Sequence, residues 1–445
     1  MVSRRQALRL GASLLPATAG CLSELRETNS SAPADVGDGE KQTPGDVPEW
    51  TPAWTLPFDG WHVLGLDTTD ELLYATLNKD NGSSAVAAVN PDEQSVLWQT
   101  ESDGEAVGGS HAAYQNISRG QWGLTLSDDT VYAVAGPAEE RQWSAVHALN
   151  QTDGERRWSL RRERELAIAG IADGLVVATG LEFFPPPGTT PVSHQTPESP
   201  LSTVVYGIDA ATGTVRWTRE FVDVQDVAVG RDGVYVAAQN RLVGLDWDGD
   251  TQFTYDRGPA TRVEAAAGRV FYLTGEESHV TLHGVGQNGS SDWRRDIPVE
   301  ELLFDGDRLY VGGDAVAAVE TDGTVAWRDD DYGQWLLLDP DRNTLYTRSG
   351  TAADAATAYD VTGEERWTFD PPSNNAWPEA ATQDVLVASA ITADHADQPF
   401  LTVYAVNAEG QATAAIGKDT VFDATGLDGT VYLADGASNL VALDP

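Results

Sequence analysis

Residues 205–217 read Val-Tyr-Gly-Ile-Asp-Ala-Ala-Thr-Gly-Thr-Val-Arg-Trp, which is an alternating strand, a turn containing Gly213, and then Trp217. The same phrase recurs along the chain, and each complete copy has glycine four residues before tryptophan. The complete pairs are Gly154 with Trp158, Gly213 with Trp217, Gly289 with Trp293, Gly323 with Trp327, and Gly363 with Trp367. Self-similarity at a regular period predicts a repeat architecture.

Other copies are degenerate. One strand reaches Trp98 without the glycine, one copy has Phe253 in place of tryptophan, and another has Ala414. A second phrase precedes each copy, a turn and then a Val/Leu-Tyr strand, as at Asp232-Gly233-Val234-Tyr235. Alternating β-branched and aromatic residues predict half-buried strands, and Asp-Gly pairs predict tight turns. Because no stretch after residue 50 has a helical period, the sequence predicts an all-β protein.

The repeat units are ~35–60 residues long with three or four short strands each, which is typical of β-propeller blades. A single blade cannot bury both of its faces, whereas neighbours in a closed ring can, and a ring leaves few open strand edges. Direct counting of strand pairs gives nine partial units. The last unit, near Tyr432, lacks an outer strand, and we expect Ala53-Trp54-Thr55-Leu56 to supply it and close the ring.

The glycine and the tryptophan have different structural roles. Glycine permits a turn conformation that most residues avoid. Tryptophan then projects between blades and covers small residues of the neighbouring unit, since a buried indole removes ~150–250 Å² from water. The predicted docking tryptophans are Trp98, Trp158, Trp217, Trp293, Trp327 and Trp367. The alternative interpretation is a row of ligand-stacking aromatic residues.

These phrases resemble the tryptophan-docking repeats of the PQQ-like (quinoprotein) β-propeller superfamily, over residues ~50–445. The resemblance implies a single propeller of eight blades, each of four antiparallel strands, whereas direct repeat counting allows nine. It is specific for fold and weak for function. The superfamily includes dehydrogenases and also non-enzymatic scaffolds such as BamB, the lipoprotein of bacterial outer-membrane assembly.

The N-terminal 46 residues predict export and a tether. Residues 1–20 have the profile of a signal peptide, and Arg4 and Arg5 resemble a twin-arginine export signal. Thr18-Ala19-Gly20-Cys21 resembles a lipobox with Thr18 in place of the usual leucine, so Cys21 is the predicted lipid attachment site; the alternative is an incidental cysteine. Residues 21–46 predict a flexible acidic linker and residues 47–445 the propeller.

The chain is strongly acidic. Asp and Glu number 69 against 28 Lys and Arg, which gives a net charge of −41. Such a charge self-repels in ordinary buffer but is screened in molar salt, where the Debye length is ~3 Å. We therefore expect a halophilic protein, a haloarchaeal lipoprotein; the alternative is simply an acidic protein. Because the sequence offers no basic surface, we expect no binding to nucleic acid or to anionic lipid.

The sequence predicts no catalytic site. The resemblance implies that dehydrogenases of the superfamily hold a quinone under a vicinal disulfide, beside calcium and a catalytic aspartate. Cys21 is the only cysteine, and no acid aligns with the calcium ligands, so we expect neither PQQ nor calcium. Asp246-Trp247-Asp248-Gly249-Asp250 superficially suggests a calcium loop but coincides with a repeat turn. His279 and His283 lack a third ligand, so no metal site is predicted.

Several features lie outside the repeat. Residues 100–122 and 181–203 interrupt the period as long loops, which often carry function in propellers. Four tryptophans fall outside the docking phase and either line an end of the ring or fill the core: Trp61, Trp143, Trp335 and Trp377. The candidate glycosylation sites are Asn29, Asn81, Asn116 and Asn288, whereas the sequon at Asn150 falls at a strand end and has a structural interpretation.

Taken together, the sequence predicts a monomeric, lipid-anchored propeller on the outer face of the cell membrane, which binds a protein partner through loops on one face. Two alternatives stay open. One is a PQQ-dependent oxidoreductase with an atypical site, and the other is a glycan-binding module that uses the off-phase tryptophans.

Overall fold

The structure is a computed structural model. It describes residues 47–445 except 80–82, 103–105, 108–123, 137–142, 183–201, 239, 257, 267, 277–278, 287–288, 298, 350–354, 372–375, 392–400 and 437. The described residues form strands β1 to β37 and no helix. None of their segments is therefore a helix that could cross a bilayer.

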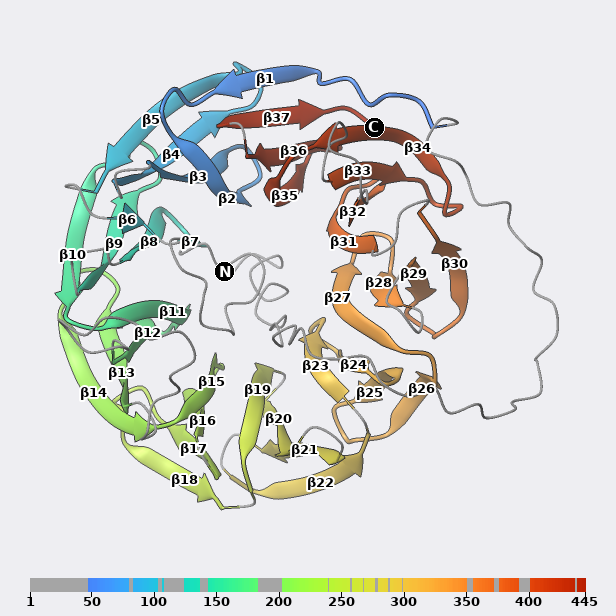
Figure 1. The fold of residues 1–445 in the computed structure, drawn as a ribbon. Coiled ribbons are helices and arrows are strands. Elements are labelled where there is room, and N and C mark those ends of the chain that lie inside the picture. Colours follow the sequence, from blue (N-terminus) through green and yellow to red (C-terminus); the bar gives the residue numbers. More distant parts are fainter. Residues whose placement is uncertain are drawn as a thin grey trace, which may run out of the picture.

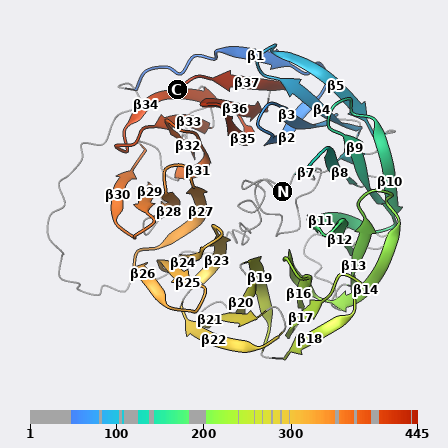
Figure 2. The same ribbon diagram turned by 180° about the vertical axis from the view of Figure 1, so that it is seen from behind.

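The strands form a ring of four-stranded antiparallel blades around a central axis (Figures 1 and 2). The innermost strands are β2 (His62–Thr68), β7 (Leu124–Ser127), β11 (Glu165–Ala172), β15 (Val224–Val229), β19 (Ala260–Ala266), β23 (Val299–Phe304), β27 (Gly333–Asp339), β31 (Ala376–Ala381) and β35 (Val421–Leu427). The second strands are β3 (Leu73–Asn78), β8 (Thr130–Gly136), β12 (Leu175–Leu181), β16 (Val234–Ala238), β20 (Arg269–Glu276), β24 (Arg308–Gly313), β28 (Thr344–Ser349), β32 (Leu386–Ile391) and β36 (Thr430–Asp435).

The third strands are β4 (Ser84–Asn90), β9 (Ser144–Asn150), β13 (Ser202–Asp209), β17 (Arg241–Leu245), β21 (His279–Gly286), β25 (Val316–Glu320), β29 (Ala355–Asp360), β33 (Leu401–Val406) and β37 (Asn439–Leu443). The outer strands are β5 (Ser95–Glu101), β10 (Arg156–Arg162), β14 (Val215–Val222), β18 (Thr251–Tyr255), β22 (Ser291–Asp296), β26 (Val325–Asp329), β30 (Glu365–Phe369), β34 (Ala412–Lys418) and β1 (Trp54–Pro57). A short extra strand, β6 (Ala106–Val107), pairs with β8.

The prediction of a single all-β propeller is confirmed, and the described residues form nine blades. We number them from blade 1 (β2–β5) to blade 9 (β35–β37 with β1). Hydrogen bonds divide the strands into eight sheets, because Gly313 and Gly333 bridge blades 6 and 7 into one sheet of eight strands. The number eight, which the resemblance implied for the blades, is thus the number of hydrogen-bonded sheets. The nine units found by direct repeat counting match the nine blades. Blades 4 and 8 keep all four strands although they lack the docking tryptophan.

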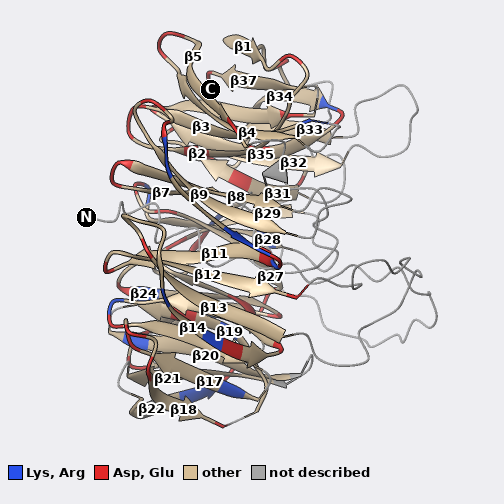
Figure 3. Ribbon diagram, turned by 90° about the vertical axis from the view of Figure 1, so that its left-hand side faces the viewer, with Lys and Arg blue, Asp and Glu red and all other residues tan. Residues whose placement is uncertain are grey.

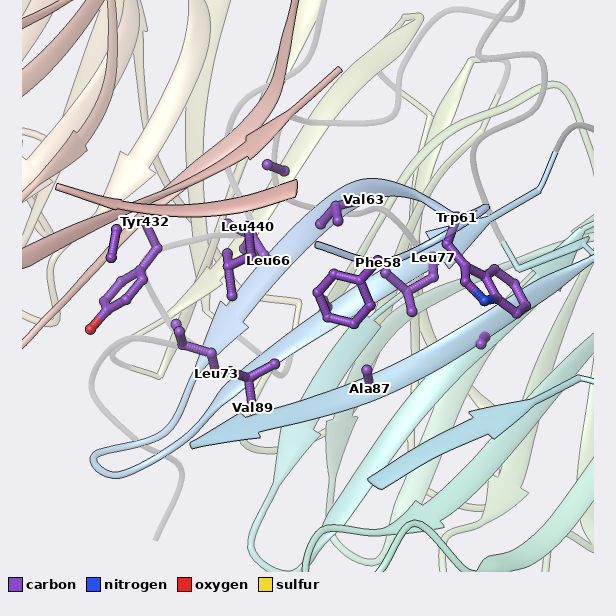
Figure 4. Packing of buried hydrophobic residues seen from close by; sticks show 14 of the residues in the cluster. Phe58, Trp61, Val63, Leu66, Leu73, Leu77, Ala87, Val89, Tyr432 and Leu440 are labelled. Atoms are coloured by element: carbon purple, nitrogen blue, oxygen red, sulfur yellow. The ribbon is translucent and has the colours of Figure 1, made fainter. Parts of the chain in front are cut away.

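The N-terminal strand closes the ring, as predicted. β1 pairs antiparallel with β37, and Trp54 lies opposite Ala442. The contact between blades 9 and 1 is a dry cluster that includes Leu66 and Leu73 from blade 1 and Tyr432 and Leu440 from blade 9 (Figure 4). Similar buried clusters fill the contacts between the other blades. The hydrophobic core is therefore distributed around the ring, one layer between each pair of sheets.

The docking tryptophans lie on the turn of the next blade. A Cβ built on Gly213 in blade 3 would come 2.6 Å from the ring of Trp158 in blade 2, so only glycine fits under that indole. The Trp158 Nε1–H donates to the carbonyl of Ala210 at 2.9 Å, which satisfies the one polar atom of the ring. The same glycine contact joins Trp98 to Gly154, Trp217 to Gly249, Phe253 to Gly289, Trp293 to Gly323, Trp327 to Gly363, and Trp367 to Gly410.

Candidate functional site

The two ends of the ring differ. Innermost and third strands begin at one end, which we call the long-loop face, because the strands flanking residues 183–201 and 392–400 meet there. Short turns join the strands at the opposite end, which we call the tight-turn face. Figure 3 shows acidic residues gathered in the turns of the tight-turn face, along the left edge of that view. Several of these carboxylates are structural; Asp209, for example, accepts the backbone N–H of Thr212 at 2.8 Å.

All four off-phase tryptophans lie at strand beginnings on the long-loop face. Trp61 precedes β2 and Trp143 precedes β9, while Trp335 and Trp377 lie within the first three residues of β27 and β31. Trp61 and Trp143 are buried, and Trp335 and Trp377 are half-buried. The docking tryptophans and the off-phase tryptophans therefore form separate sets, one near each end of the ring.

Cations stack on three of these rings. Lys79 Nζ lies 3.8 Å from the ring centroid of Trp61, and Arg161 lies 3.4 Å from that of Trp143. Arg348 lies 4.9 Å from the ring centroid of Trp377. A cation over an indole face contributes ~0.5–1 kcal/mol at exposed sites. Tryptophan and arginine are also the residues most enriched at the energetic centres of protein interfaces.

Trp335 has an unusual backbone. Its φ of 63° lies in the left-handed region, which is rare for a bulky residue and costs about 1–3 kcal/mol. The strand register shifts between Gln334 and Leu337 at this point, which indicates a bulge. The Glu301 carboxylate of the neighbouring blade accepts the Leu336 N–H at 3.1 Å and also the Trp335 N–H. The bulge is thus held by an acid from the next blade.

Asp226 and Asp423 on other innermost strands make the same kind of contact, and we call these two acids, Glu301 and the buried Glu264 the inner-strand acids. Asp226 in blade 4 accepts the Val263 N–H of blade 5 at 3.0 Å. Asp423 in blade 9 accepts the Leu66 N–H of blade 1 at 2.8 Å, across the closure of the ring. Each such contact joins two blades near the axis, while the tryptophans join them further out.

Burial perturbs three of the inner-strand acids. It raises the pKa of Glu264 to about 8, and the nearby Asp226 adds to the shift. It raises the pKa of Glu301 to about 7, although the Leu336 and Trp335 N–H groups act in the opposite direction. The pKa of Asp226 is also raised by burial, against the favourable Val263 N–H bond. Burial thus favours the protonated form of these carboxyl groups.

Two features that the sequence analysis weighed as ligand sites, the Asp246 turn and His283, have structural contacts. Asp246 Oδ1 accepts the backbone N–H groups of Asp248 at 3.0 Å and Asp250 at 2.8 Å, so its carboxylate shapes the turn. His283 is buried, stacks on Tyr272 at 4.6 Å, and lies 2.8 Å from the Thr274 hydroxyl. Among the described residues, no group of three or more His, Cys, Asp or Glu side chains is arranged to hold a metal ion.

Several predicted positions lie outside the described residues: Arg4, Arg5, Cys21, Asn29, Asn81, Asn116, Asn288 and most of the loops 100–122 and 181–203. Asn150 is described, and its Oδ1 accepts the Thr152 N–H at 2.8 Å, in keeping with its structural interpretation.

Sequence reasoning placed Trp54 in the closing strand but missed its docking position, and it missed Trp50 and one turn. Trp54 lies opposite Ala442 as Trp158 lies opposite Ala148, so it occupies the docking position of blade 9. Trp50 is buried beside the position where blade 8 has only Ala414, and its Nε1–H donates to the Asp444 carbonyl at 2.8 Å. Gln94 takes the docking-glycine position of blade 1 with a φ of 52°. Trp98 lies eight residues after Asn90, as Trp158 lies after Asn150 and Trp217 after Asp209, and this spacing was the available signal.

The family model described as outer membrane protein assembly factor BamB matches residues 50–183. This range covers the closing segment, blades 1 and 2, and half of blade 3. No curated protein matches the sequence.

Similar solved structures have low sequence identity, and one of those reported below has a TM-score above 0.5. The C-terminal WD40 domain of Sif2 has 10% identity and a TM-score of 0.51, over 90% of this chain and 99% of that one. BamB from Moraxella catarrhalis has 14% identity and a TM-score of 0.46, over 89% and 97%. Quinohemoprotein alcohol dehydrogenase from Comamonas testosteroni has 13% identity and a TM-score of 0.46, over 89% and 76%. The chain is thus a β-propeller with PQQ-like repeats in its N-terminal part.

Proposed function

We propose that this chain is a non-catalytic scaffold, anchored by a lipid on Cys21 at the outer face of the cell membrane, which binds a protein partner on its long-loop face. One observation carries the binding part of the proposal: the gathering of Trp61, Trp143, Trp335 and Trp377 at strand beginnings on a single face. The contacts on the glycine turns use a different set of tryptophans, although Trp61 and Trp143 also belong to buried clusters between blades.

The chemistry of the long-loop face supports a protein ligand. Indoles with stacked arginine or lysine side chains supply large contact areas at low entropic cost, which is characteristic of interface anchors. The acid-rich tight-turn face would repel another acidic protein. The match of residues 50–183 to a family model named for outer-membrane protein assembly is in keeping with a scaffold role.

The non-catalytic part of the proposal rests on residue chemistry. A vicinal disulfide needs two cysteines, and the chain has one. The inner-strand acids are engaged by backbone amides of neighbouring blades or hold their protons near neutral pH. The purified protein should show no dye-linked dehydrogenase turnover with added quinone and calcium, and robust turnover would overturn this part.

The binding part is tested by comparing the two faces. We expect Trp377→Ala to reduce co-purification of the partner from native membranes in molar salt by tenfold or more. Trp247→Ala, a half-buried tryptophan in a turn of the tight-turn face, is the matched control and should leave capture unchanged. Equal losses from both variants, or from neither, would contradict binding at the long-loop face.

Export and anchoring have their own test. Replacement of Arg4 and Arg5 by lysine should retain the protein in the cytoplasm, and Cys21→Ser should release it from the membrane into the medium. A Cys21→Ser protein that stays membrane-bound as wild type does would contradict the lipid anchor.

A further inference from the structure

The outer strands of the blades are open edges with one exception among the described residues. The exception is β34 in blade 8, where Glu49 forms a parallel bridge with Ala415. The Trp50 N–H donates to the Ala415 carbonyl at 2.7 Å, and the Ala415 N–H donates to the Pro48 carbonyl at 2.9 Å. An extended segment thus adds to the outer edge of a blade in this same molecule.

Charged side chains protect some of the other outer edges. The residue before the docking position is bulged in every outer strand except β1, and it is Arg157 in β10, Arg216 in β14 and Arg366 in β30. The same position is uncharged in β18, β26 and β34. Arg157 pairs with Asp129 at 2.7 Å, and Arg216 is paired with Asp209 at 2.5 Å. Charges on an edge strand oppose the addition of a further strand, because the added strand would have to desolvate them.

The outer edge of β5 in blade 1 lacks this protection. Leu97 takes the place of those arginines and is 45% exposed, and its neighbour Val96 is 38% exposed. No charged residue lies between Ser95 and Thr100. Val222 and Val325 are the other exposed large hydrophobic residues among those described, and each stands alone on its strand. Val96 and Leu97 are therefore the one adjacent pair of exposed large hydrophobic residues in the described part of the chain. The only charged side chain hydrogen-bonded to the backbone of β5 among the described residues is that of Arg156 in blade 2, which donates to the Glu101 carbonyl at the end of the strand.

This edge is continuous with the long-loop face. β5 ends at Glu101, whose carboxylate lies 3.9 Å from Lys79 Nζ. Lys79 in turn stacks on Trp61. A partner bound along β5 would therefore reach the long-loop face through these three side chains.

We propose that the outer edge of β5 receives an extended, uncharged segment of the protein partner as a fifth strand of blade 1. Backbone hydrogen bonds to the open edge supply affinity, and apolar side chains packed on Val96 and Leu97 supply specificity. In a chain with a net charge of −41, a stretch without acids from Ser95 to Thr100 also adds no repulsion of its own toward an acidic partner. The inference rests on the proposed scaffold function and names the surface that holds the partner.

The test begins with a photoreactive benzophenone amino acid at position 97 of the full chain in native membranes. The same amino acid at Val325 is the matched control, because Val325 is an exposed valine on the outer strand of blade 6. Mass spectrometry then identifies the cross-linked partner segment, and a synthetic peptide of that segment is the probe. We expect the peptide to protect β5 amides from hydrogen exchange, and Leu97→Arg to weaken its binding at least tenfold. Val325→Arg should change binding less than twofold.

Leu97→Arg should fold, because arginine stands at the matching position in blades 2, 3 and 7. The inference is overturned by cross-links that lead only to a second copy or to this chain's own residues. It is also overturned by absence of cross-links at position 97, or by Leu97→Arg binding the peptide as wild type does. If Trp377→Ala abolishes capture while Leu97→Arg does not, the scaffold function stands and the β5 site fails; if no partner is captured by any route, both fail.

Discussion

The contact between one indole and one glycine is the unit from which the ring is built. Gly213 has a φ of 70° and lies directly under the ring of Trp158. Gly174 has the same φ of 70°, but a Cβ added there would have nothing within 4 Å, so it shares the backbone requirement without the contact. Both glycines lie in blade 3. A comparison of substitutions at the two positions therefore distinguishes the cost of backbone strain from the cost of overpacking.

We predict that Gly213→Ala destabilises the protein more than Gly174→Ala does. Both variants force alanine into the left-handed region, at a cost of about 1–2 kcal/mol. Gly213→Ala adds overpacking against Trp158, about 1–3 kcal/mol more. Chemical denaturation in molar salt measures the difference. Equal destabilisation by the two variants would show that the docking contact does not constrain position 213.

The proton on Glu264 links stability to pH. Its pKa rises from 4.5 to about 8 on folding, so the folded protein binds more protons than the unfolded chain between those values. Stability from this group is therefore full below about pH 4.5 and falls as the pH rises toward 8, by up to about 1.4 kcal/mol per pH unit. Glu264→Gln should flatten the decline of the melting temperature between pH 5 and pH 8.

Asp226 and Glu301 also have raised pKa values, so Glu264→Gln should reduce the slope rather than remove it. Glu409→Gln, at an exposed turn glutamate, is the control and should keep the wild-type slope. Identical slopes for wild type and Glu264→Gln would contradict a buried, protonated Glu264.

At the scale of elements, the segment from Val47 to Pro57 joins blades 8 and 9. Its first part adds to β34, and its last part is β1, the outer strand of blade 9. Trp50 lies between them and is 3% exposed. This segment supplies a tryptophan where blade 8 has only Ala414, so the closing contact does not depend on the repeat itself.

We predict that Trp50→Ala lowers the free energy of unfolding by about 3–5 kcal/mol, the usual cost of removing a buried tryptophan. Trp247→Ala is the control, because Trp247 is half-buried in a turn and its backbone carbonyl still accepts the Trp217 Nε1–H. Thermal and chemical denaturation of both variants measure the contrast. A loss below about 1 kcal/mol for Trp50→Ala would mean that the closing segment is dispensable.

Sequence reasoning predicted the elements that carry a local signal. The glycine and tryptophan four residues apart marked the turns and outer strands, and an apolar strand with a tyrosine marked the second strand of seven blades; blades 3 and 8 have Val176 and Val387 instead. The strand that contains Trp54 was also predicted, although its partner Ala442 lies at the other end of the chain, because the last repeat unit lacks an outer strand. The turn at Gln94 was not predicted, because it has no glycine. The surrounding fold imposes the positive φ of Gln94.

The candidate site was predicted only in outline. The off-phase tryptophans were recognised, but which end of the ring they occupy depends on strand direction, which the repeat phrase does not show. The stacked Lys79 and Arg161 come from other strands, and the inner-strand acids such as Glu264 follow no sequence pattern. Most innermost strands also contain a bulge, which the repeat phrase does not mark.

At the scale of the whole molecule, charge is the dominant feature. The net charge of −41 is spread over turns around the ring, so self-repulsion opposes the compact state at low salt. The Debye length falls from ~10 Å at about 0.1 M to ~3 Å at about 1 M salt, which screens that repulsion.

We predict that the melting temperature rises steadily with KCl concentration into the molar range. Sucrose at matched osmolality is the control, because it favours burial by exclusion without screening charge. A rise in KCl that sucrose reproduces in full would show that exclusion, and not screening, stabilises the protein. A melting temperature independent of KCl would contradict the prediction of salt adaptation.

A closed ring depends on β1 lying beside β37, and a disulfide tests that arrangement most directly. Thr55 and Val441 are opposite each other in the register of these strands. In a Cys21→Ser background, which leaves no other cysteine, Thr55→Cys with Val441→Cys should form an intramolecular disulfide on oxidation and raise the melting temperature. Absence of the bond, or a bond formed only between two chains, would contradict a ring closed by its own N-terminal strand.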